Sequence, residues 1–367
     1  MPNLRFPEFE GEWEKTKLSD ITQRVSRKNK SIVSDRPLTI SAQFGLIDQR
    51  DFFNKVVASE NLEGYYLLKK GEFAYNKSYS NEHPWGVVKR LDLYEEGALS
   101  TLYICFECKK ANSDWLVHYF DSPKWNKQIS EIAVEGARNH GLLNVSIEDF
   151  FKTYHFIPKT GKEQEKLANF LTLIDNRIAT QNRIINKLQS LMKGLAEHLT
   201  AFTPNTKIAD CLNCHSSILQ ENQVKNEGKY KVYGANGICG YNDSPAILED
   251  AILIVKDGSG VGNVSYASGE YSVIGTSNYL TAKSGYSLKY LYFCLMIFNF
   301  VPYRTGMAIP HIYFKDYGKA LIPCPSLNKQ EQIATLLSKI ECKIETEKSI
   351  SESYLRQKRF LLKSMFI

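Results

Sequence analysis

Apolar residues recur at alternating steps of four and three residues along two long segments of the chain. Such a heptad pattern predicts α-helices that pair along a continuous apolar strip, which we call the seam. Each seam has one polar member, and polar residues at a seam layer fix the register of a helix pair. The seam residues are Leu167, Leu171, Ile174, Ile178, Gln181, Ile185 and Leu188 in the first segment, and Ile333, Leu337, Ile340, Ile344 and Glu347 in the second.

The two helical segments belong to an internal repeat. From Glu163 and Lys329 they align without gaps at an offset of 166 residues (329 − 163), which places Gln181 on Glu347. Each segment follows an Ile-Pro pair, where proline ends a strand before the helix begins. A helix over 163–199 would be roughly 55 Å long. We predict that the helices pair antiparallel, because the intervening chain must return; a helix packed only on its own domain would not need so long a seam.

Short apolar runs bounded by glycine and asparagine turns predict strands outside the two helices. Short helices are expected at 17–21 and 207–211, where each globular part begins. The fold class is therefore α+β, with two pseudo-symmetric mixed α/β domains joined by a pair of long antiparallel coiled-coil helices. The expected strands are 64–68, 73–76, 100–107, 229–233, 251–255 and 271–274, and the expected divisions are 1–155, 156–205, 206–320 and 321–367.

The positive charge of the chain is concentrated in the helical segments. Lys+Arg minus Asp+Glu gives 21 − 22 = −1 for 1–155, 7 − 4 = +3 for 156–205, 10 − 9 = +1 for 206–320 and 8 − 5 = +3 for 321–367. Nearly neutral globular parts argue against DNA binding through bulk charge alone, so partners are expected to supply part of it. No apolar run approaches the roughly 20 residues of a membrane span, and the start lacks a signal-peptide core, which predicts a cytoplasmic protein.

Two CxxC pairs raise the possibility of a zinc site. Cys105 and Cys108 form one pair and Cys211 and Cys214 the other, but the pairs are more than 100 residues apart. Zinc ribbons place such pairs about 15–20 residues apart, so ordinary reduced thiols are favoured and no metal site is expected. The string from Cys211 to His215 matches covalent haem attachment, and without an export signal we interpret it as a chance match.

Catalytic motifs are not evident in the sequence. A DNA methyltransferase would carry an Asn/Asp-Pro-Pro-aromatic loop, and the chain has no Pro-Pro dipeptide. The glycine-rich string 258–262 lacks the Gly-Lys-Ser/Thr of a P-loop and the spacing of a dinucleotide-binding loop. No Ser-His-Asp set or clustered histidine and carboxylate set is evident among the 7 His. We therefore expect a chain that is not catalytic alone.

Several loops combine cationic, amide, hydroxyl and aromatic side chains, the types that contact DNA. Arginine reads guanine and asparagine reads adenine, whereas lysine, serine and tyrosine commonly hold phosphate. A solvated loop is the alternative for any single residue. The candidates are Asn76, Lys77, Ser78, Tyr79, Ser80, Lys89, Arg90, Arg138, Asn139 and His140 in the first half, and Asn236, Lys256, Ser259, Thr276, Ser277, Asn278, Tyr303, Arg304 and Thr305 in the second.

Several strings, in order along the chain, resemble the specificity subunit of type I restriction-modification enzymes. They are the N-terminal string 2–13, the strings 73–77, 233–238 and 306–312, and the two Ile-Pro-to-helix segments. The resemblance covers 1–367. It implies two target-recognition domains, each reading one half of a bipartite site in double-stranded DNA. The globular parts are expected to vary between members, so most of their residues inherit no role.

The resemblance also implies partners. The helices would act as a spacer between half-sites and dock two methyltransferase (modification) subunits, with restriction (translocase-nuclease) subunits completing an adenine-methylating complex for phage defence. S-adenosylmethionine, ATP and Mg would belong to those partners, with no cofactor in this chain. Two other hypotheses stay open: a coiled-coil scaffold for protein interaction without its own sequence readout, and a catalytic methyltransferase or nuclease, which the missing motifs disfavour.

Overall fold

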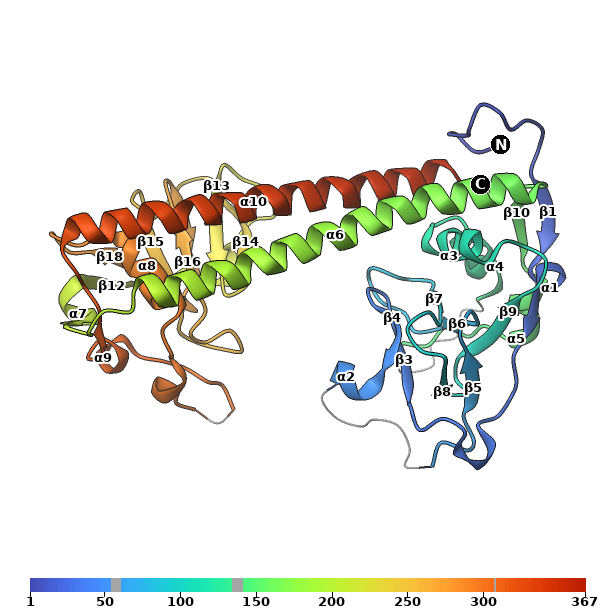
Figure 1. The fold of residues 1–367 in the computed structure, drawn as a ribbon, viewed down its shortest axis with the longest axis horizontal. Coiled ribbons are helices and arrows are strands. Elements are labelled where there is room, and N and C mark those ends of the chain that lie inside the picture. Colours follow the sequence, from blue (N-terminus) through green and yellow to red (C-terminus); the bar gives the residue numbers. More distant parts are fainter. Residues whose placement is uncertain (54–60, 134–140, 307) are drawn as a thin grey trace. The chain divides into compact units, whose positions relative to one another are not determined.

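The chain divides into two compact units in the computed structural model, which describes residues 1–53, 61–133, 141–306 and 308–367. Unit 1 contains Met1–Thr180 and Ser351–Ile367, and unit 2 contains Gln181–Ile350. The long helices α6 (Gly161–Leu199) and α10 (Leu327–Ser364) each contribute a stretch to both units. In each unit the stretch of α6 lies beside the stretch of α10 (Figure 1). The helices begin two residues before the predicted starts at 163 and 329.

Unit 1 has a mixed α/β part before α6. Its helix α3 begins at an asparagine cap, since the side chain of Asn112 accepts a hydrogen bond from the Trp115 backbone N–H at 2.9 Å. The elements are β1 (Glu14–Lys17), α1 (Leu18–Ile21), β2 (Thr22–Arg24), β3 (Leu38–Ser41), β4 (Gly45–Asp48), α2 (Gln49–Phe53), β5 (Tyr66–Lys69), β6 (Phe73–Asn76), β7 (Val87–Arg90), β8 (Glu96–Leu99), β9 (Ile104–Cys108), α3 (Ser113–Asp121), α4 (Asn126–Ile132), α5 (Ile147–Lys152) and β10 (Tyr154–Ile157).

Unit 2 has its mixed part between the two long helices. Its helix α8 begins at a serine cap, because Ser287 Oγ accepts from the Tyr290 backbone N–H at 3.4 Å. The elements are β11 (Thr206–Lys207), α7 (Ile208–Cys211), β12 (Leu212–Ser216), β13 (Tyr230–Gly234), β14 (Gly237–Asn242), β15 (Ala251–Val255), β16 (Val264–Ala267), β17 (Tyr271–Val273), β18 (Ser277–Ala282), α8 (Leu288–Met296), α9 (Phe314–Tyr317) and β19 (Leu321–Ile322).

The main sheets of the two units have the same topology. The order is β2-β9-β6-β7 in unit 1 and β12-β18-β15-β16 in unit 2, with every neighbouring pair antiparallel. A two-stranded pair, β1 with β10 and β11 with β19, connects the start of each mixed part to the strand before its long helix. These sheets, with one helix packed on each, confirm the expected pseudo-symmetric α+β fold.

The residues of the predicted helix seams are buried or half-buried. Within unit 1, Leu167, Leu171 and Ile174 are buried in one cluster with Leu361 and Leu362. Within unit 2, the seam residues Ile333 and Leu337 are buried in a cluster with Ala196, and Ile185 and Ile344 are also buried. The seam members Ile178, Leu188 and Ile340 are half-buried.

The polar seam layer is a buried hydrogen-bonded pair. Gln181 Nε2 donates to the Glu347 carboxylate and, at 3.1 Å, to the Glu347 backbone carbonyl. Glu347 also pairs with Lys343 at 2.5 Å, and this hydrogen bond, with that from Gln181, lowers the pKa of its carboxyl group. A satisfied polar pair fixes one register for the two helices, since any slip would leave these groups unpaired.

Both ends of the chain complete the core of unit 1. Phe366 is fully buried against Trp13 and Trp115, with ring centroids 6.4 and 5.9 Å apart. The Leu4 backbone N–H donates to the Ser364 carbonyl at 3.0 Å. The N-terminal string 2–13 is therefore a structural part of unit 1.

One predicted strand begins later than expected. Residues 100–103 form a turn, in which the Tyr103 N–H donates to the Ser100 carbonyl at 3.2 Å, so β9 spans only Ile104–Cys108. The prediction of a strand from 100 was wrong because the apolar pattern also matches a turn beside the sheet. The predicted strands 73–76 and 251–255 match β6 and β15.

Candidate nucleic-acid interface

Three loops of unit 2 converge beyond the end of β15. The Lys256 N–H donates to the Thr276 carbonyl at 2.9 Å, and the Gly258 N–H donates to Pro310 at 3.0 Å. Thr305 and His311 exchange backbone hydrogen bonds at 2.9 and 2.8 Å. The structure thus brings together loops that are up to about fifty residues apart in the sequence, and we call them the unit 2 loop cluster (256–263, 274–276, 303–306 and 308–312).

The loop cluster contains six of the nine second-half candidates: Lys256, Ser259, Thr276, Tyr303, Arg304 and Thr305. Lys256 is half-buried, whereas Ser259, Thr276 and Thr305 are exposed. Arg304 is exposed, and its guanidinium donates to the Val261 carbonyl at 2.8 Å, which orients the side chain across the cluster. Tyr303 is half-buried against Phe298, with centroids 5.8 Å apart.

The other three second-half candidates differ in accessibility. Ser277 and Asn278 are buried on β18. Asn278 Oδ1 accepts a hydrogen bond from Ser216 Oγ at 2.8 Å, so the Asn278 side chain connects β18 to β12. Asn236 is exposed in the β13–β14 turn. That turn adjoins the cluster, because a Cβ on Gly260 would lie 3.7 Å from the Ala235 carbonyl.

In unit 1 the loop after β6 packs on a second segment. The Leu143 N–H donates to the Lys77 carbonyl at 2.8 Å, and the Tyr79 N–H donates to the Gly141 carbonyl at 2.6 Å. Ser78, Tyr79 and Ser80 are exposed, while Asn76 and Lys77 are half-buried. Burial lowers the pKa of the Lys77 ammonium. The candidates Arg138, Asn139 and His140 lie outside the described residues.

Lys89 and Arg90 are engaged within unit 1. Lys89 pairs with Asp121 at 2.7 Å, and Asp121 also pairs with Lys358 of α10. Arg90 pairs with Asp92 and Asp114 at 2.7 and 2.8 Å, and both cationic side chains are about four-fifths buried. Neighbouring aspartates therefore neutralise both cations within unit 1.

The cysteines of the two CxxC pairs are buried or half-buried. Cys105 is buried on β9, where burial raises its pKa to about 12, and Cys211 is buried at the end of α7. Within the described ranges, no three His, Cys, Asp or Glu side chains are grouped closely enough to hold a metal ion. No helix in that part of the chain is long and apolar enough to cross a membrane.

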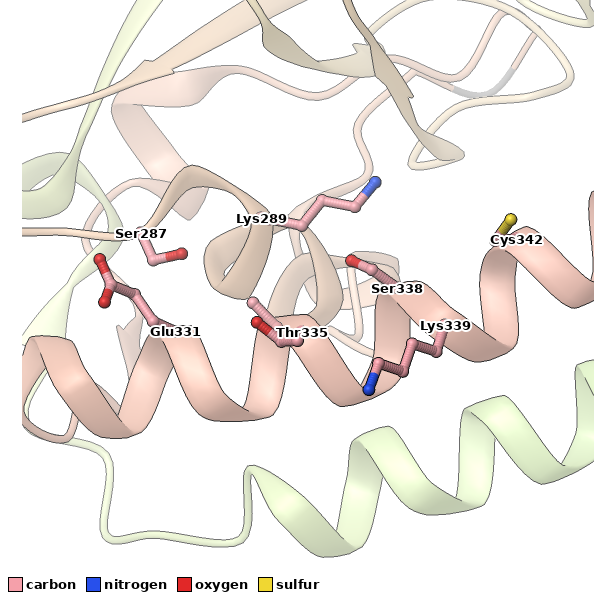
Figure 2. Close-up of a pocket in the computed structure, with 8 residues that line it drawn as sticks. Ser287, Lys289, Glu331, Thr335, Ser338, Lys339 and Cys342 are labelled. Carbon is pink, nitrogen blue, oxygen red and sulfur yellow. The ribbon is translucent and has the colours of Figure 1, made fainter.

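An open depression of about 640 Å³ lies along α10 in unit 2 (Figure 2). Ser287 and Lys289 at the start of α8 line it together with Glu331 and Thr335 of α10. Lys289 pairs with Glu341 at 2.7 Å and lies 3.8 Å from the Tyr266 ring centroid. The ion pair connects α8 to α10, and the contact with the Tyr266 ring connects α8 to β16. None of the residues lining the depression belongs to the loop cluster.

Sequence reasoning missed two kinds of residue. His311 and the exposed Tyr313, with ring centroids 5.1 Å apart, belong to the segment that closes the loop cluster. Gln164 and Gln330 are buried at matching positions of the repeat, and their Oε1 atoms accept from the Asn112 and Ser287 N–H groups at 2.7 and 3.0 Å. The repeat offset of 166 residues (330 − 164) was the sequence signal from which the equivalence of these two glutamines could have been predicted.

Comparisons with known proteins agree with this geometry. Residues 206–353 match the family model described as the type I restriction modification DNA specificity domain. No curated protein matches the chain. The crystal structure of the type I restriction-modification system S subunit from M. genitalium is similar over 100% of this chain and 99% of that one, at 16% identity and a TM-score of 0.61.

A second solved structure supports the same fold. It is described as showing complex assembly and conformational transition of the type I R-M system, and it covers 97% of both chains at 14% identity with a TM-score of 0.53. At these identities the likeness establishes the fold. Residues 206–353 are therefore similar to the type I restriction modification DNA specificity domain, in a chain whose fold is similar to that of a type I S subunit throughout.

Proposed function

We propose that this chain is the DNA-specificity subunit of a type I restriction-modification complex, and that each mixed α/β part reads one half of a bipartite site. One observation carries the proposal: the same four-stranded sheet with the same loop arrangement occurs in both units. Two equivalent reading surfaces suit a target with two separate halves. The specificity-domain match over 206–353 supports a DNA-reading role for the second of these surfaces.

The two parts are proposed to correspond to 1–155 and 206–320, with 156–205 and 321–367 as spacer helices. An uninterrupted helix such as α6, with 39 residues, extends roughly 58 Å. This exceeds the roughly 34 Å between half-sites one helical turn apart. We therefore assign the helix pair the role of setting the distance between the DNA half-sites.

The same helices are proposed to dock methyltransferase subunits. Apolar side chains remain exposed on them, including Leu173 on α6 at 61% and Phe360 on α10 at 62%. Contiguous exposed apolar patches rimmed by polar residues mark protein contacts, and we propose that these side chains belong to such a patch. In this assembly the chemistry, with S-adenosylmethionine, ATP and Mg, belongs to methyltransferase and restriction subunits, and this chain supplies recognition.

The test is a comparison of methylated DNA motifs in cells that carry this chain with its methyltransferase partner. Replacing 206–320 with the corresponding part of another specificity subunit should change one half of the methylated motif and preserve the other half and the spacing. Replacing 1–155 should change the complementary half.

Two controls define failure. Cells without this chain should show no motif, and the same methyltransferase with the unaltered chain should show one bipartite motif. A change in both halves after one replacement would contradict the assignment of one part to one half-site. An unaltered motif after both replacements would instead favour a protein-binding scaffold.

A further inference from the structure

The sheet registers identify which residues of the two units are structurally equivalent. Phe73 pairs with Phe106 in unit 1, and Ile252 pairs with Leu280 in unit 2. The registers of the edge strands β2 and β12 support the same equivalence, because Arg24 opposes Phe106 and Cys214 opposes Leu280. Counting along β6 and β15 from these pairs places two lysines, Lys77 and Lys256, one residue beyond the equivalent strands.

The backbone contacts of the two lysines also match. The Lys77 carbonyl accepts from the Leu143 N–H at 2.8 Å, and the Lys256 carbonyl accepts from the Ile312 N–H at 2.9 Å. The next residues form equivalent bridges, Ser78 with Leu142 and Asp257 with His311. The offset between the lysines is 179 residues (256 − 77), compared with 166 between the helices, so the equivalence is visible only in the structure.

Neither ammonium group is neutralised by a carboxylate in the described part of the chain. Lys77 Nζ contacts the Val145 carbonyl at 3.4 Å, and Lys256 forms no ion pair there. This contrasts with Lys89, which is about four-fifths buried and pairs with Asp121. Both lysines are half-buried, in contrast to the exposed loop residues Ser78 and Ser259.

The residues that follow the lysines differ between the units. Ser78 and Tyr79 in unit 1 correspond to Asp257 and Gly258 in unit 2. Both units thus have a lysine at this position, while the neighbouring residues differ. A shared cation suits the phosphate backbone, because the backbone is the part of DNA that is the same in every sequence. Phosphate contacts position a protein on DNA, and base contacts specify the sequence.

We propose that Lys77 and Lys256 are an equivalent pair of phosphate anchors, each holding the DNA backbone at one half-site while the differing neighbours read the bases. This assignment rests on the proposed function. Lysine suits the role because its ammonium is a compact charge on a flexible stem. The pair would fix each reading surface on the duplex in the same register.

The test is the salt dependence of DNA binding by the full chain, measured with a mixed-sequence duplex. Removing one phosphate contact should reduce the slope of log K against log salt by about 0.9. Lys77→Gln and Lys256→Gln should each bind the duplex more weakly than the unaltered chain. The ratio between the two affinities should shrink about 3.5-fold as the salt concentration rises from about 50 to 200 mM. The double variant should show about a 12-fold shrinkage, because the two sites act independently.

Matched variants separate charge from structure. Lys77→Arg and Lys256→Arg should retain the slope. Lys70→Gln and Lys229→Gln should leave it unchanged. Lys70 precedes β6, at the end opposite Lys77, and Lys229 precedes β13, at the end opposite the turn that adjoins the loop cluster. A lowered melting temperature with an unaltered slope would overturn the inference, as would a weakening confined to one DNA sequence. Failure of the unaltered chain to bind any duplex would overturn the proposed function as well.

Discussion

The carboxylate of Glu163 connects the N-terminal string to the start of α6. It is almost fully buried and accepts from Arg5 Nε at 2.7 Å, from Arg5 Nη2 at 2.8 Å and from Trp13 Nε1 at 3.0 Å. Glu163→Ala removes all three acceptor contacts. It leaves the indole N–H of a buried tryptophan without a partner and the Arg5 charge without its carboxylate.

The expected loss of stability follows from these contacts. Breaking a buried ion pair by removing one partner costs about 3–5 kcal/mol. The lower end applies here, because Arg5 keeps the carbonyls of Gly11 and Glu10 at 2.5 and 3.1 Å. The unsatisfied indole N–H adds about 1 kcal/mol, for a total of about 4 kcal/mol. In a unit of 197 residues (180 + 17), this lowers the melting temperature by roughly 8 to 16 °C.

Tryptophan fluorescence measures this destabilisation selectively. All 4 Trp of the chain, at positions 13, 85, 115 and 125, lie in unit 1. Thermal and urea unfolding followed by emission should therefore report the unit 1 transition. Glu165→Ala is the matched control, because it removes the same charge from an exposed position two residues along α6 and should change stability by less than about 0.5 kcal/mol.

Two results would refute this reasoning. One is a destabilisation below about 1 kcal/mol in Glu163→Ala, and the other is an equal destabilisation in Glu165→Ala. The double variant Arg5→Ala/Glu163→Ala should be little less stable than Glu163→Ala alone, since the two side chains form one interaction.

Three further predictions concern other parts of the chain. Burial lowers the pKa of His155 from 6.5 to about 4. As the pH falls, the unfolded state therefore binds a proton at this histidine before the folded state does. Unit 1 should lose about 3 kcal/mol of stability between pH 6.5 and 4. Urea titrations by fluorescence should show this, and His155→Gln should flatten the dependence. Gln181→Glu places two carboxylates at the buried seam layer and should lower the melting temperature at pH 8. Adding Glu347→Gln should restore the melting temperature, as measured by circular dichroism. A double variant that melts no higher than Gln181→Glu would exclude direct contact between the two side chains. Arg304→Ala should weaken specific DNA binding by about 1–3 kcal/mol in titrations, and unchanged affinity would remove it from the interface.

The helix pair was predictable because its information is local. A heptad pattern states which face of a helix is apolar, and two matching patterns imply that the helices pair. The polar layer of Gln181 and Glu347 was visible for the same reason. The strand that was expected from residue 100 shows the limit, because short apolar runs match both strands and turns.

The candidate interface was less predictable, because ion pairing depends on distant residues. Lys89 and Arg90 adjoin each other and resemble a DNA-binding pair, yet Asp121 and Asp114 neutralise them from α3. The convergence of the loops at 256–263, 303–306 and 308–312 likewise follows from the sheet and not from any spacing in the sequence. The pairing of Lys77 with Lys256 required the strand registers of both units.

The burial of Phe366 beside Trp13 sets an order for folding during synthesis. Unit 2 is one continuous stretch, 181–350, so its core can form as soon as that stretch has left the ribosome. Unit 1 needs residues from both ends of the chain, including Leu361, Met365 and Phe366. Domains generally fold in the order of translation, N-terminal first. Here the part made first has an incomplete apolar core until residues 361–366 have been made.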